Sequence, residues 1–170
     1  VTIPHKEAVI QYLGRVDRAV SEIGAVNTLV LEGGQLVGYN TDSRAALDSL
    51  APHLPQPNAE PPSSAGKALI LGAGGAAMAV AYGLKRSGYE VFVAGRTRDR
   101  AEALCARLGC KSLAWGARHS VDCDVLVNCT PVGMHPNLDE TPFPKHHLKP
   151  SMVVFDTVYN PENTLLVKDA

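Results

Sequence analysis

Apolar residues in the C-terminal two thirds of the chain form short runs that alternate with helical patterns. Residues 78–86 have helical spacing and precede Gly88, and residues 99–108 form a second helical segment that ends at Gly109. The apolar runs predict buried strands at 67–71, 90–94, 125–127 and 152–155. Strands that alternate with helices are typical of α/β proteins with a parallel sheet wound with helices.

The N-terminal part of the chain has a different pattern. A strand is predicted at 25–31, and Gly33-Gly34 marks a hairpin from which residues 35–40 return. Residues 6–13, after Pro4, and residues 43–50 are predicted to be helices, the second capped by Asp42 or Ser43.

A proline-rich stretch separates these two parts. Residues 51–65 have little periodicity and are predicted to be a linker or an exposed loop. The predicted organisation is therefore a smaller, partial α/β domain at 1–50, the linker at 51–65, and an α/β domain at 66–170 that is incomplete at its C-terminal end.

Composition narrows the classes of protein. The chain has 170 residues, of which 45% are hydrophobic and 19% charged, as in ordinary globular proteins. A net charge of −1 gives no indication of a nucleic-acid or anionic-membrane partner, and no apolar stretch is long enough to span a bilayer. The four cysteines form no C-x-x-C pair and have no histidine at ligand spacing. We therefore expect reduced thiols, no metal site and a cytoplasmic protein.

A glycine-rich turn joins the strand at 67–71 to the next helix. The turn fits G-x-G-x-x-A, in which Gly72 allows a sharp turn, Gly74 lets the backbone approach phosphate, and Ala77 packs the helix on the strand. Such a turn also occurs without a ligand, but its place between strand and helix favours a dinucleotide site in a Rossmann-like, doubly wound parallel sheet. The predicted cofactor-binding residues of this turn are Gly72, Ala73, Gly74, Gly75 and Ala76.

A basic stretch follows the next strand. No acid closes that strand to bind a ribose 2′-hydroxyl, and Arg96 has the planar fork that suits a 2′-phosphate, while Thr97 or Arg98 adds donors. The alternative is a helix start with solvated arginines. Beside the glycine-rich turn, the stretch predicts NADP rather than NAD, and hence hydride-transfer chemistry.

Several polar motifs stand in a distinctive order around this turn. They are Val1-Thr2-Ile3-Pro4-His5-Lys6, Ile23-Gly24-Ala25-Val26-Asn27-Thr28, Gly38-Tyr39-Asn40-Thr41-Asp42, Asn128-Cys129-Thr130-Pro131-Val132-Gly133-Met134 and Asp156-Thr157-Val158-Tyr159-Asn160-Pro161. With this set, the chain resembles the shikimate dehydrogenases over essentially its whole length. The resemblance implies reversible, NADPH-dependent reduction of 3-dehydroshikimate to shikimate in the shikimate pathway of aromatic amino-acid biosynthesis. Residues 134–142 resemble the form fused to a dehydroquinate dehydratase, as in plants, and also some single-domain bacterial forms, so a fused partner and a plastid location stay open.

The resemblance also implies roles for single residues. Lys6 and Asp42 are the implied catalytic pair, because oxidation of an alcohol removes a proton together with the hydride. Whether Lys6 carries that proton or binds the substrate is left open. Taken singly, Lys6 would be interpreted as a solvated lysine, Asp42 as a helix cap and Met134 as a core residue. Only together with the surrounding motifs do these residues predict a site. The implied substrate-binding residues are Thr2, Asn27 and Tyr159, and further cofactor contacts are Thr130, Met134 and Val158.

The chain departs from the family pattern in three ways. Gly95 stands where the family usually has asparagine, which weakens the NADP inference but leaves Arg96 and Thr97. Ser43-Arg44-Ala45 replaces a bulky residue followed by glycine, with no inferred consequence. The family's N-terminal serine loop and C-terminal glutamine segment are absent, so we expect a piece of a longer protein that binds shikimate poorly alone.

Other functions compete with this interpretation. Quinate or quinate/shikimate dehydrogenases share the lysine–aspartate pair, so they stay open. A non-catalytic NADP-binding module and a different Rossmann enzyme are disfavoured, because Lys6 and Asp42 are intact. The oligomeric state is not predicted.

Overall fold

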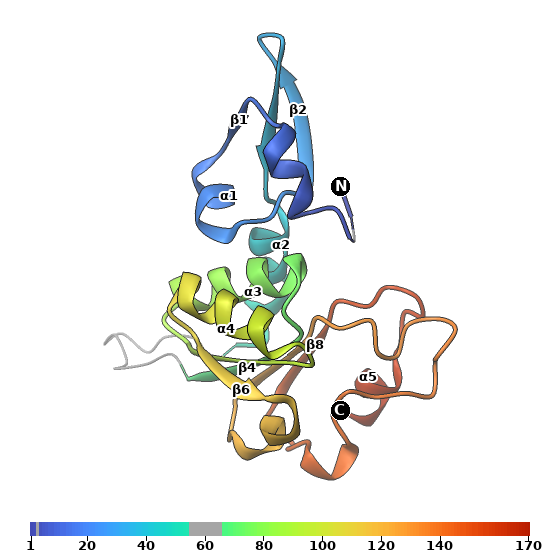
Figure 1. The fold of residues 1–170 in the computed structure, drawn as a ribbon. Coiled ribbons are helices and arrows are strands. Elements are labelled where there is room, and N and C mark those ends of the chain that lie inside the picture. Colours follow the sequence, from blue (N-terminus) through green and yellow to red (C-terminus); the bar gives the residue numbers. More distant parts are fainter. Residues whose placement is uncertain (3, 55–65) are drawn as a thin grey trace.

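The computed structural model describes residues 1–2, 4–54 and 66–170, which build two sheets. A three-stranded sheet has the order β1-β3-β2, and a five-stranded sheet has the order β6-β5-β4-β7-β8. The first projects from the helical layer above the second (Figure 1). The elements of the smaller unit are η1 (Ala8–Tyr12), β1 (Arg15–Val16), α1 (Arg18–Ile23), β2 (Thr28–Glu32), β3 (Gln35–Tyr39) and α2 (Asp42–Leu50). The larger unit contains β4 (Lys67–Leu71), α3 (Gly75–Arg86), β5 (Glu90–Gly95), α4 (Arg98–Leu108), β6 (Lys111–Ala114), η2 (Trp115–Ser120), β7 (Val125–Asn128), η3 (Lys145–His147), β8 (Val153–Asp156) and α5 (Leu165–Asp169).

The predicted hairpin is present, and its neighbours differ in detail. β2 and β3 pair antiparallel around Gly33 and Gly34, whose φ angles of 55° and 80° suit glycine. The helix predicted at 6–13 is wrong in type and extent, because only the 3-10 helix η1 forms there. The Lys6 carbonyl accepts a hydrogen bond from the Val26 N–H at 2.7 Å, so the first helical turn lacks that acceptor.

Two short helices of the smaller unit have unexpected starts. α1, which the sequence did not predict, begins where the Asp17 carboxylate accepts from the Val20 N–H at 2.7 Å. The predicted cap of α2 is also wrong, because Thr41 precedes the helix without a side-chain cap, and the Asn40 side chain accepts from the Ser43 N–H at 3.3 Å. The Asp42 carboxylate is thereby left for another partner.

The parallel sheet is covered on both faces. Side chains of its strands alternate between a core under α3 and α4, which includes Ile70 and Val93, and a second core on the opposite face, which includes Leu69 and Phe143. Figure 1 shows α3 and α4 on one side of the sheet and α5 on the other. The predicted strands and the α/β, doubly wound fold class are confirmed. α3 begins earlier than predicted, at Gly75, and β6 and α5 were not predicted.

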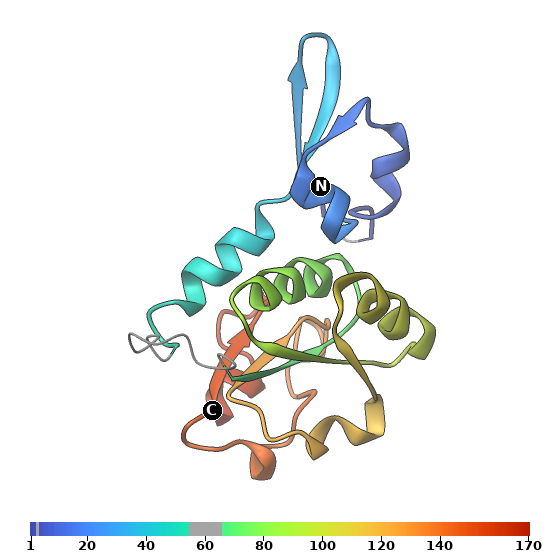
Figure 2. The ribbon, with the colours of Figure 1, turned by 90° about the vertical axis from the view of Figure 1, so that its left-hand side faces the viewer.

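α2 lies against α3 of the larger unit (Figure 2). Ala46 and Leu50 join the core on the α3 side of the parallel sheet. Gly83 permits this approach, since a Cβ atom built there would lie 3.0 Å from both Leu47 Cγ and Ser43 Oγ. The helix that begins at Asp42 is therefore docked on the larger unit.

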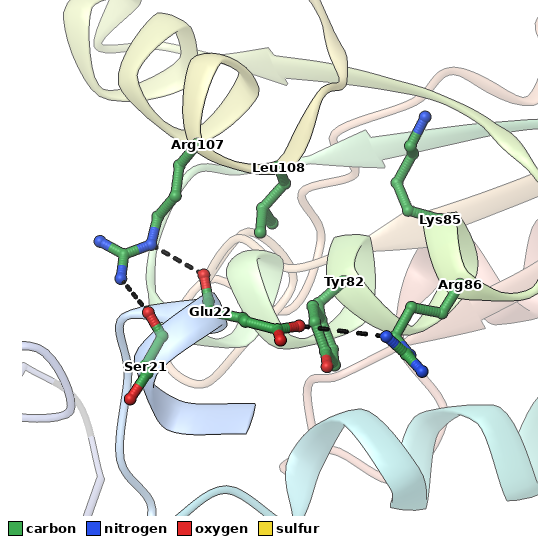
Figure 3. Close-up of a pocket in the computed structure, with 7 residues that line it drawn as sticks. All are labelled: Ser21, Glu22, Tyr82, Lys85, Arg86, Arg107 and Leu108. Atoms are coloured by element: carbon green, nitrogen blue, oxygen red, sulfur yellow. Dashed lines mark hydrogen bonds and ion pairs between the residues drawn. The ribbon is translucent and has the colours of Figure 1, made fainter. Parts of the chain in front are cut away.

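A second contact joins α1 to α3 and α4 (Figure 3). Arg107 donates to the carbonyls of Ser21 and Glu22 at 2.6 and 2.8 Å, and the Glu22 carboxylate lies 4.0 Å from Arg86. A cavity of about 530 Å³ lies among these side chains. It contains none of the predicted site residues, so we assign these contacts to holding the two units together.

The predicted linker falls mainly outside the described residues. Residues 51–54 form turns, and the stretch from 55 to 65 is not described. Within the described ranges, no helix combines the length and hydropathy needed to cross a membrane.

Candidate active site

The glycine-rich turn leaves β4 at the carboxyl edge of the parallel sheet. Gly72 has a φ of 110°, and a Cβ atom there would lie 2.8 Å from the Cys129 carbonyl oxygen, so this position requires glycine. A Cβ atom on Gly74 would meet nothing within 4 Å. α3 begins directly after Gly74 and has no acidic residue in its first turn. Its free N–H groups and the positive end of its dipole therefore form a site suited to an anion.

A cavity of about 560 Å³ opens at this turn. Residues from both units line it. Most of the predicted site residues are among its walls, namely Thr2, Lys6, Gly72, Ala73, Gly74, Gly75, Ala76, Arg96, Thr97, Thr130, Met134 and Tyr159. The volume is in the range of small-molecule and cofactor sites.

Lys6 and Asp42 meet at the wall of this cavity. Lys6 Nζ donates to Asp42 Oδ2 at 2.7 Å, and the other carboxylate oxygen of Asp42 accepts from Asn27 Nδ2, also at 2.7 Å. Asn27 is itself held, because its Oδ1 accepts from the Thr41 N–H at 3.0 Å. The side chains of Lys6 and Asp42 are 15% and 30% exposed. Asn27 and Asp42 thus stand behind Lys6 and fix its ammonium at the cavity.

The basic residues after β5 divide between the cavity and the surface. Arg96 and Thr97 line the cavity, whereas Arg98 is exposed and pairs with Glu102 at 2.7 Å along α4. The structure therefore does not bring Arg98 to the cavity. Arg100 does line it and pairs with Glu7 of the smaller unit at 2.5 Å. Sequence reasoning missed Arg100, although its place on the first turn of α4, three residues after Thr97, was a usable signal.

The loops after β7 and β8 are tied together at the same edge. Buried Asn128 donates to Asp156 Oδ1 at 3.0 Å and accepts from Thr130 Oγ1 at 2.7 Å. The same Asp156 oxygen accepts from the Val158 N–H at 2.9 Å. Val158 itself is buried outside the cavity wall, while Tyr159 lies on that wall and is 85% exposed.

The described residues include all four cysteines. No cluster of three or more potential ligands occurs there, and all four cysteines are free. Burial raises the pKa of Cys105 to about 12 and that of Cys123 to about 11. These thiols are protonated at neutral pH and are therefore poor nucleophiles.

The fold and the anion-binding turn agree with the class of protein that a family model identifies, the NADP oxidoreductases. Residues 67–158 match the family model described as "NADP oxidoreductase coenzyme F420-dependent", which places the larger unit, and more than half of the chain, among NADP oxidoreductase domains. Residues 1–29 match the model of the shikimate dehydrogenase substrate binding domain. The resemblance to the shikimate dehydrogenases, which the sequence predicted, is confirmed.

Individual relatives cover the whole chain. It is 40% identical over 181 residues to the chloroplastic bifunctional 3-dehydroquinate dehydratase/shikimate dehydrogenase of Arabidopsis thaliana, with 99% of this chain and 30% of that protein covered. Curated relatives named shikimate dehydrogenase (NADP(+)) are 36% to 42% identical, and the chain spans about 60% of their length.

Solved structures of shikimate and quinate dehydrogenases have a similar fold. The crystal structure of shikimate 5-dehydrogenase from Thermus thermophilus in complex with NADP(H) and shikimate has a TM-score of 0.84 and 36% identity, covering 99% of this chain and 61% of that one. Quinate dehydrogenase from Corynebacterium glutamicum in complex with NAD has a TM-score of 0.82 and 32% identity, covering 99% and 60%.

Proposed function

We propose that the chain is the core of an NADP-dependent oxidoreductase that interconverts 3-dehydroshikimate and shikimate in aromatic amino-acid biosynthesis. The observation that carries the proposal is that Lys6, held by Asp42, and the anion-binding turn line one cavity. A group that handles a proton and a turn suited to a dinucleotide are thereby brought to the same place. That combination is what alcohol oxidation by a nicotinamide cofactor requires.

The walls of the cavity fit NADP. The open space at Gly74 and the first turn of α3 suit a pyrophosphate, which Gly72, Ala73, Gly75 and Ala76 would also surround. Arg96, Thr97 and Arg100 supply donors and positive charge for a 2′-phosphate. Thr130 and Met134, after β7, would face the nicotinamide end, and Val158 would support that loop from behind. When bound, NADP⁺ accepts the hydride.

The protein's own groups would handle the substrate. The Lys6 ammonium stands at the cavity wall and can exchange a proton with the reacting oxygen. Asp42 and Asn27 orient it. Thr2 and Tyr159 line the same wall and offer hydroxyl groups to a polyhydroxylated ring. The intact Lys6–Asp42 contact is what disfavours a module that binds the cofactor without turnover.

A second candidate is oxidation of quinate. The likeness to the C. glutamicum quinate dehydrogenase favours keeping it. We further propose a cytoplasmic location, or a plastid location if the chain belongs to a bifunctional protein with a dehydroquinate dehydratase domain, as in the A. thaliana relative. The proposed domain division is a substrate-binding unit at 1–50 and an NADP-binding unit at 66–170.

The test is a substrate and cofactor comparison with the full-length protein. Reduction of NADP⁺ is measured with shikimate and with quinate, and each assay is repeated with NAD⁺. We expect shikimate with NADP⁺ to give the largest kcat/KM. A larger kcat/KM with quinate would make quinate the substrate in place of shikimate, and a larger kcat/KM with NAD⁺ would make NAD⁺ the cofactor in place of NADP⁺. Absence of turnover with all four pairs, in a protein that binds NADP⁺, would instead establish the non-catalytic module.

A further inference from the structure

Two adjacent glycines of the turn face different surroundings. A Cβ atom on Gly74 would meet nothing within 4 Å, which leaves room for a ligand. A Cβ atom on Gly75 would lie 3.1 Å from Lys6 Cβ, 3.3 Å from Lys6 Cδ and 3.4 Å from Ala25 Cβ. Gly75, the first residue of α3, therefore lies against the stem of a lysine that belongs to the other unit.

The Lys6 stem has little freedom to move away from Gly75. Its main-chain carbonyl accepts from the Val26 N–H at 2.7 Å, and its Nζ is bound to Asp42 at 2.7 Å. Asp42 is held in turn by Asn27. Lys6 is therefore held both at its main chain and at its ammonium group, so its side chain cannot simply rotate away from a methyl group at position 75. Such a methyl group would instead displace the stem together with the ammonium.

We propose that Gly75 is a positioning residue for Lys6. Its missing Cβ seats the lysine stem on the first turn of α3 and so fixes the distance between the reacting ammonium and the cofactor turn. Within one glycine-rich turn, Gly74 then makes room for the cofactor and Gly75 makes room for Lys6. This inference rests on the proposed function, in which Lys6 meets the reacting oxygen.

The position of Lys6 matters because catalytic rates fall steeply with misplacement. A displacement of about 1 Å can cost about a hundredfold in rate, and on that scale a shift of a few tenths of an ångström corresponds to about several-fold to tenfold. The cofactor turn belongs to the parallel sheet, whereas Lys6 belongs to the smaller unit. The Gly75 contact is where these two parts are brought into register.

Two matched alanine variants test the proposal in the full-length protein. Gly75→Ala is expected to lower kcat roughly tenfold and to leave the Kd of NADP⁺, measured by equilibrium dialysis, within about twofold of wild type. Gly74→Ala is expected to show the opposite split, with a Kd raised about tenfold or more and a smaller change in kcat. Neither glycine has a positive φ, so both variants are compatible with folding, which thermal unfolding checks.

A readout without turnover accompanies the kinetics. The rate of reductive methylation of Lys6 is followed by peptide mass spectrometry in the cofactor-free protein. It should rise several-fold in Gly75→Ala, because the ammonium is drawn from Asp42, and stay unchanged in Gly74→Ala. A wild-type kcat and methylation rate in Gly75→Ala would overturn the inference, as would a loss of NADP⁺ affinity that equals its loss of kcat. If the wild type oxidises neither shikimate nor quinate, the proposed function fails, and the methylation rate still decides whether Gly75 seats Lys6.

Discussion

Asp42 holds the ammonium of Lys6 at 2.7 Å across 36 positions of sequence. Lys6 lies just before η1, and Asp42 is the first residue of α2, so the β2–β3 hairpin stands between them in the chain. The Asn40 side chain, and not that of Asp42, accepts from the Ser43 N–H at the start of α2, and the Asp42 carboxylate accepts from Lys6.

Removal of the Lys6 amine should abolish most turnover. We expect Lys6→Ala to lower kcat by about 10²- to 10⁴-fold, since a positioned proton-transfer group contributes on that order. The Kd of NADP⁺ should stay close to wild type, because the turn and α3 are intact. Steady-state kinetics and equilibrium dialysis measure the two effects. Lys85→Ala is the matched control, since Lys85 lines the cavity among α1, α3 and α4, and its removal should leave kcat unchanged. A near-normal kcat in Lys6→Ala would remove Lys6 from the reaction.

Arg96 and Arg98 form a natural pair for testing cofactor choice. Arg96→Ala should weaken NADP⁺ by about tenfold or more and NAD⁺ much less, because only NADP⁺ has the 2′-phosphate. Arg98→Ala should change neither affinity, since Arg98 is exposed and pairs with Glu102. Isothermal titration of all three proteins with both cofactors gives the comparison. Equal weakening of NADP⁺ and NAD⁺ in Arg96→Ala would show that Arg96 does not recognise the 2′-phosphate.

Four strands of the parallel sheet, β4, β5, β7 and β8, were predictable because they stand out as apolar runs, whereas the edge strand β6 has mostly exposed residues and was missed. Ile70 pairs with Val93 on one side and Val127 on the other, and each lies in a run that the sequence predicts. α1 and α5 escaped prediction because they are only six and five residues long, too short for a clear helical period.

The site was predictable as a set of residue types, and its geometry was not. The local sequence pattern does not show that the Val26 N–H donates to the Lys6 carbonyl, or that the Asn27 side chain donates to Asp42. Both hydrogen bonds join segments that are distant in sequence. Arg98 and Arg100 are equivalent as basic residues near a helix start, and only the direction of α4 turns one to the surface and the other to the cavity. The first two contacts depend on packing within the smaller unit, and the Arg100–Glu7 pair depends on packing between the two units.

The close approach of α2 and α3 should be sensitive to side-chain volume. We expect Gly83→Val to lower the free energy of unfolding by about 2 kcal/mol, because overpacking costs about 1–3 kcal/mol. Its first added carbon alone would lie 3.0 Å from Leu47 Cγ. Gly116→Val is the control, since a Cβ atom there meets nothing within 4 Å. Urea unfolding compares both variants with wild type, and equal stability of the two would contradict a tight α2–α3 contact.

His119 should contribute to the pH dependence of stability. Burial lowers its pKa from the ordinary value of 6.5, and the nearby charges of Arg118, His147 and His146 lower it further. Its ring stacks on His147 at 4.1 Å and lies 5.0 Å from the Phe143 ring. Because the unfolded chain binds this proton more readily, stability is fully present above pH 6.5 and is lost as the pH falls from 6.5 toward the lower folded pKa.

The His119→Phe variant isolates this contribution. It keeps a ring in the stack and removes the titration. The two measurements are made at about pH 7.5 and about pH 5.5, on either side of the ordinary pKa of histidine. Between these pH values, the free energy of unfolding should fall more in wild type than in the variant. Urea unfolding at the two pH values provides the measurement. An equal loss in both proteins would mean that His119 titrates alike in the folded and unfolded states.

Because α2 is docked at its C-terminal end, a small tilt of this helix would move the residue at its other end. Asp42 stands at one end of the helix, and Leu50, 2% exposed, is embedded at the other. A helix of nine residues is about 13 Å long, so a tilt of about 5° about Leu50 moves Asp42 by about 1 Å. Shifts of that size are enough to change a rate about a hundredfold. Under the proposed function, we therefore expect substitutions in the core around Leu50 to change the turnover rate without contacting the substrate.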